Sequence, residues 1–406
     1  MPRARPQCEN YQVTVRKTAH APIKRGTLKH IRYSVIIVGL GAIGSYLAGE
    51  LTARGYSVLG LEQYAPVHDR GGYSGESRLF RMAYHEGAEY VPLLKYSRNY
   101  FIDLDTRHPA KLFHQTGALT IGHPNGAGLI GVQDSINNFH IDFEAYDAEE
   151  LRRRYPQHAD ITDEIGILDK QGGVLYSDAI VHQMQQEAKA AGAELYTHEE
   201  VVGFEETARG VKVRTVRDTY KTDHLIVCAG VWSKTLMPEL EPYVSIVPIS
   251  LGWYITNGVT DYAPSSFPGF IRESNGSHLY GFPCLDGMTV KVGNVGNRSE
   301  VPTPRELPPR ASGPALREPA QLVTRYLKGV TDGPARHSMH MDLFSQDHRP
   351  IIDRLSGRII VATAFSGHGF KLTPALGRAI ADLVEDQEPA FSLQNFNLSR
   401  FFEPSA

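Results

Sequence analysis

The chain has little cysteine, no long apolar run and no excess of either charge. Cys8, Cys228 and Cys284 are far apart and form neither a CxxC pair nor a metal-ligand spacing. We therefore expect a reducing, cytoplasmic setting, with no disulfide scaffold and no metal site. No stretch approaches the roughly 18 apolar residues of a membrane span. Lys and Arg total 42 against 45 Asp and Glu, so we expect no general attraction to nucleic acid or to a membrane surface.

The 406 residues are enough for two or three domains. Residues 1–32 contain many Lys and Arg, one acidic residue and no apolar core. This composition is not that of a secretory signal. We interpret residues 1–32 as a disordered basic extension.

The strongest motif lies in residues 35–62, VIIVGLGAIGSYLAGELTARGYSVLGLE. An apolar run typical of a buried parallel strand precedes Gly39, Gly41 and Gly44, which have the spacing G-x-G-x-x-G. An amphipathic helix follows, and its first turn can bind a pyrophosphate through Gly41, Ala42 and Ile43. A second strand ends at Glu62, whose carboxylate can accept hydrogen bonds from an adenosine ribose.

These residues predict a βαβ unit that binds a dinucleotide. The motif alone does not separate FAD from NAD. The alternative is a βαβ unit whose glycines serve only helix packing.

A glycine-containing loop follows, and residues 77–81 (SRLFR) suggest the start of a helix with Arg78 and Arg81 on one side. Two such arginines are usually solvated. Beside a dinucleotide they could instead hold a phosphate or a substrate carboxylate.

In the βαβ unit, in residues 77–81 and in residues 89–93 (EYVPL), the chain resembles the monomeric sarcosine oxidase and N-methyltryptophan oxidase family. These are FAD-dependent oxidoreductases similar to D-amino-acid oxidase. The similarity covers roughly residues 33–402, and it favours FAD over NAD. It implies an α/β fold, in which a Rossmann-like FAD-binding domain is interleaved with an α+β substrate domain on a mixed, largely antiparallel sheet. The expected FAD-binding domain comprises residues 33–115, 176–246 and 347–402, and the substrate domain residues 116–175 and 247–346.

The middle of the chain predicts further elements. We expect strands at 113–121, 194–202 and 243–254, a loop-rich return at 145–175, a hairpin at 211–227 and a surface loop at 303–319. Ser177 is the expected N-cap of an amphipathic helix. Gly230 follows a buried strand, which suggests close backbone approach to the cofactor. The resemblance implies that the backbone of Val201 lies near the adenine.

Asp286-Gly287 is a hairpin signal. A two-residue turn there would pair Phe282 with Lys291 and place Tyr280 on the same face. Alone, Lys291 would more often be a solvated strand lysine. The resemblance implies that it lies over the flavin and activates oxygen, and that Tyr280 lines the substrate pocket.

Three positions depart from the family pattern. Two pocket histidines of sarcosine oxidases are matched by Val295 and Ser74, which argues against sarcosine itself as the substrate. Many family members also attach the flavin through a cysteine where this chain has Ser338 or, in the ungapped reading, His340. We therefore expect FAD to be bound without a covalent link, although a histidyl link through His340 is chemically possible.

Near the C-terminus, residues 358–364 predict a buried strand. A glycine turn is predicted in the segment that follows, FSGHGFKLTP. Thr373 is the expected N-cap of a helix with Pro374 at its first position. The backbone of Gly367, His368 and Gly369 would then meet negative charge on the flavin. The resemblance implies that Lys371, in this loop, pairs with the substrate carboxylate together with Arg81, and that Arg78 serves FAD.

We interpret the chain as a monomeric FAD-dependent oxidase of a small N-methyl, secondary or cyclic amino acid. It would transfer a hydride to flavin, giving an imine and, with oxygen, hydrogen peroxide. One alternative is a flavin dehydrogenase or biosynthetic tailoring oxidase with a larger amino-acid-like substrate. The other is a non-catalytic flavin-binding protein.

Overall fold

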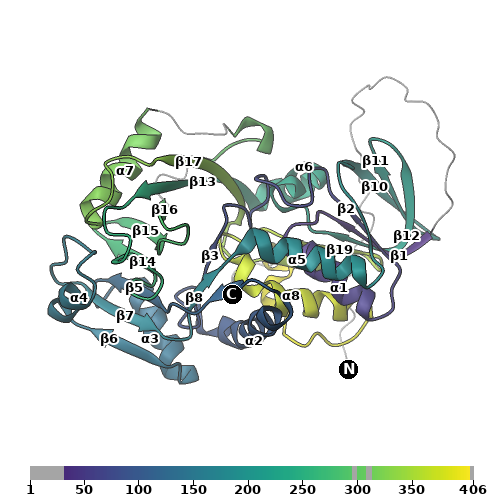
Figure 1. Cartoon of the computed structure of the whole chain (residues 1–406). Coiled ribbons are helices and arrows are strands. Elements are labelled where there is room, and N and C mark those ends of the chain that lie inside the picture. Colours follow the sequence, from purple (N-terminus) through teal and green to yellow (C-terminus); the bar gives the residue numbers. More distant parts are fainter. Residues whose placement is uncertain (1–31, 295–299, 308–312, 403–406) are drawn as a thin grey trace.

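The computed structural model describes residues 32–294, 300–307 and 313–402 (Figure 1). Their strands form two eight-stranded sheets and one three-stranded sheet. Residues 1–31 of the predicted extension, and Val295, lie outside the described residues. Arg32 is the first residue of strand β1, so the predicted end of the extension is one residue too late.

The first sheet contains the predicted βαβ unit. In β1, Val35 and Ile37 face one apolar cluster, and Ile36 and Val38 face another, as expected of a strand buried on both sides. β1 is parallel to β2 and β12, and β12 is parallel to β19. The strands are β1 (Arg32–Val38), β2 (Val58–Leu61), β9 (Glu194–Tyr196), β10 (Val201–Thr207), β11 (Gly210–Thr215), β12 (Thr219–Val227), β18 (Ile351–Arg354) and β19 (Ile359–Thr363).

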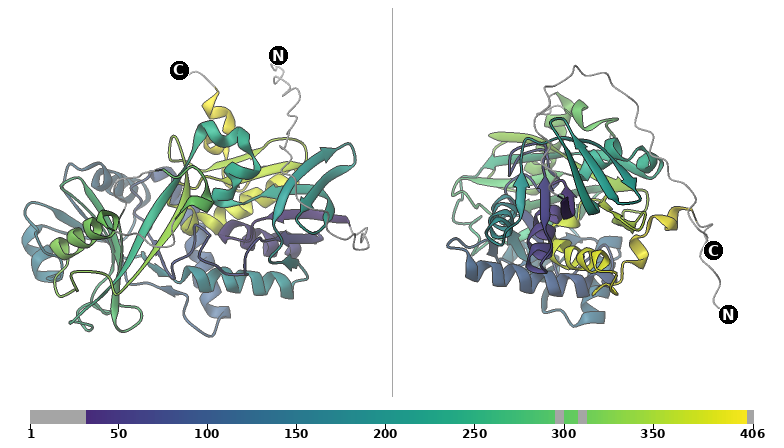
Figure 2. Two further views of the ribbon diagram at one scale, coloured as in Figure 1. Left: turned by 90° about the horizontal axis from the view of Figure 1, so that it is seen from above. Right: turned by 90° about the vertical axis from the view of Figure 1, so that its right-hand side faces the viewer.

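Helices α1 (Ala42–Ala53), α5 (Ser177–Ala190) and α8 (Gly369–Val384) cover one face of this sheet, with α2 (Val91–Arg107) against α8 (Figures 1 and 2). Their buried apolar side chains share one cluster with Val35 and Ile37. Gly55, at φ +92°, follows the end of α1, as the sequence predicts. This packing presents the N-terminal ends of α1 and α8 to the same cleft.

The second sheet is the predicted mixed one. Its strands are antiparallel except for the parallel pair β5–β14. Residues of the long strands β13 and β17, including Ile246 and Met341, also pack in the core of the first sheet. The strands are β5 (Ala118–Gly122), β6 (Phe143–Tyr146), β7 (Ile165–Asp169), β13 (Val244–Ile255), β14 (Gly269–Ser274), β15 (Ser277–Phe282), β16 (Thr289–Asn294) and β17 (Arg336–Ser345).

The prediction of a helix from Ser77 to Arg81 is wrong. Residues 78–80 form strand β3 (Arg78–Phe80), which pairs with β8 (Gly173–Leu175), and β8 also pairs with β4 (Phe113–His114). The physical reason is non-local, because β8 satisfies the backbone groups of β3 from nearly a hundred residues away. Arg78 and Arg81 therefore lie on or next to an extended segment rather than on one face of a helix.

Several element boundaries also differ from the predictions. The strands expected at 113–121 and 194–202 are each two strands, β4 with β5 and β9 with β10. The return at 145–175 contains β7 and β8, and the expected loop at 303–319 includes the start of helix α7 (Pro314–Tyr326). Ser177 is the first residue of α5, and the N-cap is Tyr176. The remaining helices are α3 (Ala127–Phe139), α4 (Ala148–Arg154) and α6 (Ser233–Leu236), with short 3-10 helices at Ala88–Tyr90, Gly230–Trp232, Pro238–Tyr243, Pro304–Glu306, Gln394–Phe396 and Leu398–Phe401.

Helix α8 begins earlier than predicted. It starts at Gly369 with His368 as N-cap, so Thr373 is not the cap and Pro374 lies inside the helix. Phe370 and Leu372 are buried in the core, and this packing outweighs the one hydrogen bond that Pro374 cannot donate. Lys371 therefore lies in the first turn of α8, not in a loop.

In the part of the chain that the structure describes, no helix has the length and apolarity that crossing a membrane requires. Among the same residues, no three His, Cys, Asp or Glu side chains are grouped as metal ligands.

Candidate active site

The glycine loop after β1 has the tight packing that its spacing predicts. A Cβ on Gly39, at φ +92°, would lie 2.5 Å from the carbonyl oxygen of Cys228, and one on Gly44 would lie 1.9 Å from that of Gly39. Gly41 is different, because its nearest neighbour is the ring of Tyr73, 3.7 Å from such a Cβ. Gly39 and Gly44 are thus needed for the fold, whereas Gly41 leaves the first turn of α1 accessible.

Glu62 lies at the end of β2 and is buried. It accepts hydrogen bonds from the backbone N–H of Leu40 (2.9 Å) and of Tyr64 (3.0 Å), and His68 Nε2 is 3.4 Å from Oε1. Burial alone would raise the pKa of Glu62, but His68 and the two N–H donors together lower it below its ordinary value. The residue is therefore an ionised acceptor attached to the glycine loop.

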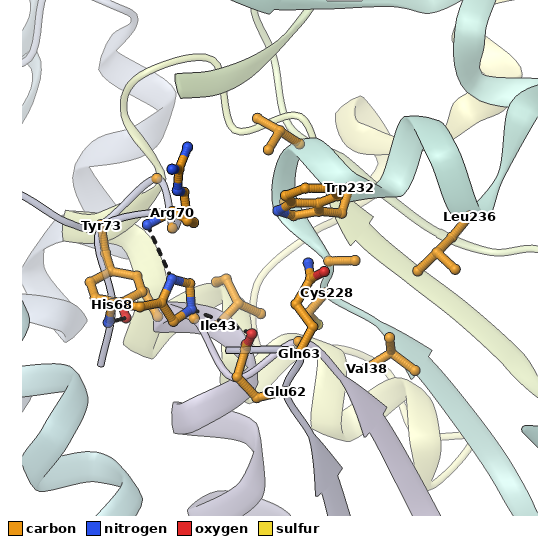
Figure 3. A pocket seen from close by; sticks show the side chains of 18 of the residues that line it. Val38, Ile43, Glu62, Gln63, His68, Arg70, Tyr73, Cys228, Trp232 and Leu236 are labelled. Atoms are coloured by element: carbon orange, nitrogen blue, oxygen red, sulfur yellow. Dashed lines mark hydrogen bonds and ion pairs between the residues drawn. The ribbon is translucent and has the colours of Figure 1, made fainter. Parts of the chain in front are cut away.

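A cleft runs from Glu62 past the N-terminus of α1 to that of α8 (Figure 3). In Figure 3, Glu62, His68 and Tyr73 lie on one side, and Cys228 and Trp232 on the other. Of the predicted cofactor residues, the cleft is lined by Gly39, Gly41, Ala42, Ile43, Glu62, Val201, Gly230 and Gly369. Nothing lies within 4 Å of where a Cβ on Gly230 would be, which leaves room for close approach.

Four predicted cofactor residues do not line this cleft: Gly44, Arg78, Gly367 and His368. His368 contacts the Tyr84 hydroxyl through Nδ1 at 3.0 Å and the His348 carbonyl oxygen through Nε2 at 3.0 Å. Arg78 donates to the carbonyl oxygens of Gly72 and Ser74 at 2.8 and 2.6 Å. It therefore holds the loop beside the cleft.

Sequence reasoning missed several groups that line the cleft, among them His68, residues 70–73, Trp232 and Asp342. Gly71 and Gly72 were recognised as a loop, and that loop directly follows Glu62 in the chain. Its position was a signal that it could cover the cofactor. Asp342 had no such signal, because it lies in a strand far along the chain.

Asp342 Oδ2 accepts the N–H of Gly367 at 2.8 Å, and Oδ1 accepts that of Leu343 at 2.8 Å. Burial raises the pKa of Asp342 to about 6, against the lowering effect of these two donors and of Arg78 and Lys371. The N–H of Gly367, predicted to face the flavin, is thus already bonded to a carboxyl group.

Lys291 shows the predicted register, because it pairs with Phe282 across β15 and β16. Its ammonium group lies 3.9 Å from the Phe282 ring centroid and donates to Gly75 O, Ser77 O and Ser77 Oγ at 2.8, 2.8 and 2.5 Å. Burial, followed by the charge of Arg78, brings the pKa of Lys291 well below its ordinary value. The lysine is a buried group that joins the second sheet to the loop before β3.

Tyr280 is on the same strand as Phe282, with ring centroids 6.1 Å apart. It fills the space above Gly293, where a Cβ would lie 2.2 Å from the tyrosine ring. Tyr280 is therefore part of the same wall as Lys291, as predicted.

His340 is buried on β17. Its Nδ1 lies 2.7 Å from Ser74 Oγ, and its Nε2 lies 2.7 Å from Ser338 Oγ. Burial, with the charges of Arg78 and Lys291, lowers its pKa to about 3, so the imidazole is neutral. Both ring nitrogens have partners, which leaves neither free to attach a flavin.

Arg81 and Lys371, nearly 300 residues apart in the chain, meet around Tyr84. The Arg81 guanidinium carbon is 4.9 Å and Lys371 Nζ is 5.4 Å from the Tyr84 ring centroid. Burial, then the charge of Arg81, lowers the pKa of Lys371 to about 7, although Glu86 opposes this. Two buried cations therefore lie against one tyrosine ring, and their binding of one ligand stays a prediction.

Arg81 already has an internal partner. Its Nη2 donates to Glu86 Oε1 at 2.7 Å, and its Nη1 contacts His85 Nδ1. Burial would raise the pKa of Glu86, but Arg81, His85 and Lys371 hold it well below its ordinary value. Arg81 Nε and Glu86 Oε2 are buried and have no hydrogen-bond partner among the described residues. The site is thus a polar cluster with unused donors and acceptors.

Comparisons with known proteins agree with this geometry. The family model "FAD dependent oxidoreductase" matches residues 34–383. Monomeric sarcosine oxidase from Streptomyces avermitilis is 32% identical over 359 residues, which cover 87% of this chain and 93% of that protein. N-methyl-L-tryptophan oxidase from Salmonella typhi is 30% identical over 378 residues, 91% of this chain and 100% of that protein.

Solved structures show the same fold. NikD, described as an unusual amino acid oxidase essential for nikkomycin biosynthesis, aligns with a TM-score of 0.80 at 22% identity, covering 90% of this chain and 97% of that chain. L-Proline dehydrogenase from P. horikoshii aligns with a TM-score of 0.76 at 21% identity, covering 91% of this chain and 98% of that chain.

Proposed function

The chain belongs to the FAD-dependent oxidoreductase family, and on this premise we propose that it oxidises the C–N bond of a small N-methyl, secondary or cyclic amino acid. When bound, FAD supplies the two-electron oxidation, taking a hydride from the carbon next to nitrogen and passing electrons to oxygen, which yields an imine and hydrogen peroxide. The protein supplies binding, orientation and charge.

The residues of the cleft fit FAD. The N-terminus of α1 beside Gly41 can hold the pyrophosphate, and the ionised Glu62 can accept from the ribose. Gly230 leaves room for close approach. With both nitrogens of His340 in hydrogen bonds, we infer that FAD is bound without a covalent link.

The observation that carries the substrate assignment is the convergence of Arg81 and Lys371. We infer that the substrate carboxylate binds both, using the unpartnered Arg81 Nε and the Lys371 ammonium. A buried anion needs such partners. Tyr280 forms the adjoining wall of the substrate pocket.

We assign Lys291 to the oxygen half of the reaction. It is buried beside the loop of residues 75–77, and its three oxygen acceptors favour the charged form against the burial that lowers its pKa. A positive charge in a dry site stabilises negative charge that develops on oxygen during reduction.

We also retain the proposed division into an FAD-binding domain (33–115, 176–246 and 347–402) and a substrate domain (116–175 and 247–346). Apart from Arg32, all strands of the first sheet fall within the first set of ranges. Those of the second sheet fall within the other set, apart from the first residues of β13. We propose that the protein acts as a monomer.

The decisive experiment mixes the protein with N-methyl and cyclic amino acids without oxygen and follows bleaching of the flavin's visible band. We expect bleaching by carboxylate substrates and none by their methyl esters. Admission of oxygen should restore the colour and produce hydrogen peroxide. Ready oxidation of an ester would refute the carboxylate site. Slow recovery of the colour in oxygen would favour the alternative of a flavin dehydrogenase. If no amine bleaches the flavin, a non-catalytic flavin-binding role is favoured.

A further inference from the structure

A second polar cluster lies on the face of the second sheet that carries Tyr280 and Lys291. His278 and Tyr280 are two residues apart on β15 and therefore project from the same face. His278 pairs with Glu273 of β14, which places the carboxylate on that face as well. The wall formed by Tyr280 and Lys291 thus continues into an acid–histidine pair.

Glu273 and His278 line a cavity of about 380 Å³ between the ends of β14 and β15 and the start of α3. His278 Nδ1 lies 3.1 Å from Glu273 Oε1, and 29% and 35% of the two side chains are exposed. A Cβ on Gly128 of α3 would lie 2.3 Å from Glu273 Oε2, so a glycine there makes room for the carboxylate. The adjacent helix N-terminus also favours a negative charge.

The hydrogen bond from His278 lowers the pKa of Glu273 below its ordinary value, and the charge of Arg81 contributes in the same direction. Glu273 is therefore an ionised carboxylate near neutral pH. The cavity beside this carboxylate leaves room for another group.

A single imidazole ring connects this pair with Arg81. His85 has its ring centroid 6.2 Å from that of His278, and its Nδ1 contacts the Arg81 guanidinium. Burial, with the charge of Arg81, lowers the pKa of His85 to about 4, although Glu86 opposes this, so the ring is neutral. His85 therefore lies between Arg81 and the pair formed by Glu273 and His278.

We propose that Glu273 and His278 bind the far end of the substrate side chain, and that the preferred substrate is an N-alkyl or cyclic amino acid with a cationic or hydrogen-bond-donating terminus. This inference rests on the proposed function above. An apolar side chain in the same place would desolvate the Glu273 carboxylate without replacing its hydrogen bonds. The site therefore selects against aromatic and aliphatic side chains.

The test compares α-N-methyllysine with α-N-methylnorleucine, which has the same carbon chain without the terminal ammonium group. We expect kcat/KM to favour the lysine derivative by about 10- to 100-fold, as one charge-assisted contact can provide. Glu273→Gln should abolish that preference by lowering kcat/KM for the lysine derivative toward that for the norleucine derivative. Glu318→Gln, at an exposed glutamate of α7, is the matched control and should keep the full preference.

A second measurement does not depend on the folding of a variant. Perturbation of the flavin spectrum by 6-aminohexanoate and by hexanoate gives their affinities for the wild-type protein, and the amino compound should bind at least about tenfold more tightly. Equal affinity, or equal kcat/KM for the two amino acids, would overturn this inference and leave the proposed function intact. Failure of every N-methyl and cyclic amino acid to bleach the flavin would refute both.

Discussion

At the scale of the residue, Lys371 is a buried cation whose charge depends on pH near neutrality. Its pKa is lowered to about 7, by burial and then by Arg81, so the ammonium form predominates below pH 7 and is lost as the pH rises above it. A carboxylate ligand pairs with the charged form. We therefore expect a carboxylate inhibitor to bind most tightly below pH 7 and to weaken by up to about tenfold per pH unit above it.

Titrations of the flavin spectrum with the inhibitor between pH 6 and 9 would measure this dependence. Glu86, whose pKa is held well below its ordinary value, stays ionised in that range, and Asp342, with a pKa near 6, is largely ionised above pH 7. Lys371→Met should weaken binding at pH 6 by about 10- to 150-fold and flatten the profile. Lys189→Met, at an exposed lysine of α5, should behave as wild type. A flat wild-type profile would contradict a role for Lys371 in holding the carboxylate.

Lys291 is a second buried cation, and we expect it to serve the opposite half of the reaction. Removing its charge in Lys291→Met should slow flavin reoxidation by oxygen about 10²- to 10³-fold, the usual effect of losing one preorganised electrostatic contact. Flavin reduction should change far less. Stopped-flow traces of the two half-reactions separate these effects, with Lys328→Met, at an exposed lysine, as control. Equal losses in both half-reactions would indicate that Lys291 only supports the loop of residues 75–77.

At the scale of the element, local patterns predicted well what local physics determines. The unit β1–α1–β2 has its expected bounds within three residues, and Gly44 is required by a contact inside the unit itself, since a Cβ there would meet the backbone of Gly39. The register of Phe282 with Lys291 was also predicted from the Asp286-Gly287 signal, and the Asp286 carboxylate accepts the backbone N–H groups of Met288 and Thr289 in this loop. In both cases the determining contacts lie close along the chain.

Elements that depend on distant partners were not predictable in this way. Residues 78–80 resemble the start of a helix, and only pairing with β8 makes them a strand. Helix α8 begins before Pro374 because Phe370 and Leu372 are buried against other elements. Their positions matter for the site, since β3 directly precedes Arg81 and the first turn of α8 carries Lys371.

At the scale of the whole molecule, the site is made by convergence of segments that the sequence keeps far apart. The contact of Lys291 with Ser77 and that of His340 with Ser74 join residues more than 200 positions apart. Neither the composition nor the periodicity of the sequence indicates which distant residues come into contact. The resemblance to a known family indicated Arg81, Tyr280, Lys291 and Lys371 together. Asp342, Glu273 and His278 needed the structure, because nothing adjacent in the chain identifies them.

The contacts of His340 also predict whether the flavin leaves the protein on denaturation. Acid precipitation should leave the yellow colour in the supernatant, because His340 has no free nitrogen for a covalent link. Colour in the pellet would contradict this and indicate a link through His340.

Removal of FAD under mild conditions should destabilise the whole fold, because the cleft is lined by segments from β1 to α8. FAD at about 100 times its dissociation constant contributes about 2.7 kcal/mol. At about 2–4 °C per kcal/mol, the apoprotein should melt about 5–10 °C lower. Trp232 lines the cleft and is one of only two tryptophans, so its fluorescence should rise as FAD leaves and fall when FAD is restored. Trp232→Phe should lose most of that signal and keep the shift in melting temperature. An apoprotein that melts with the holoprotein would show that FAD does not stabilise these segments as one unit.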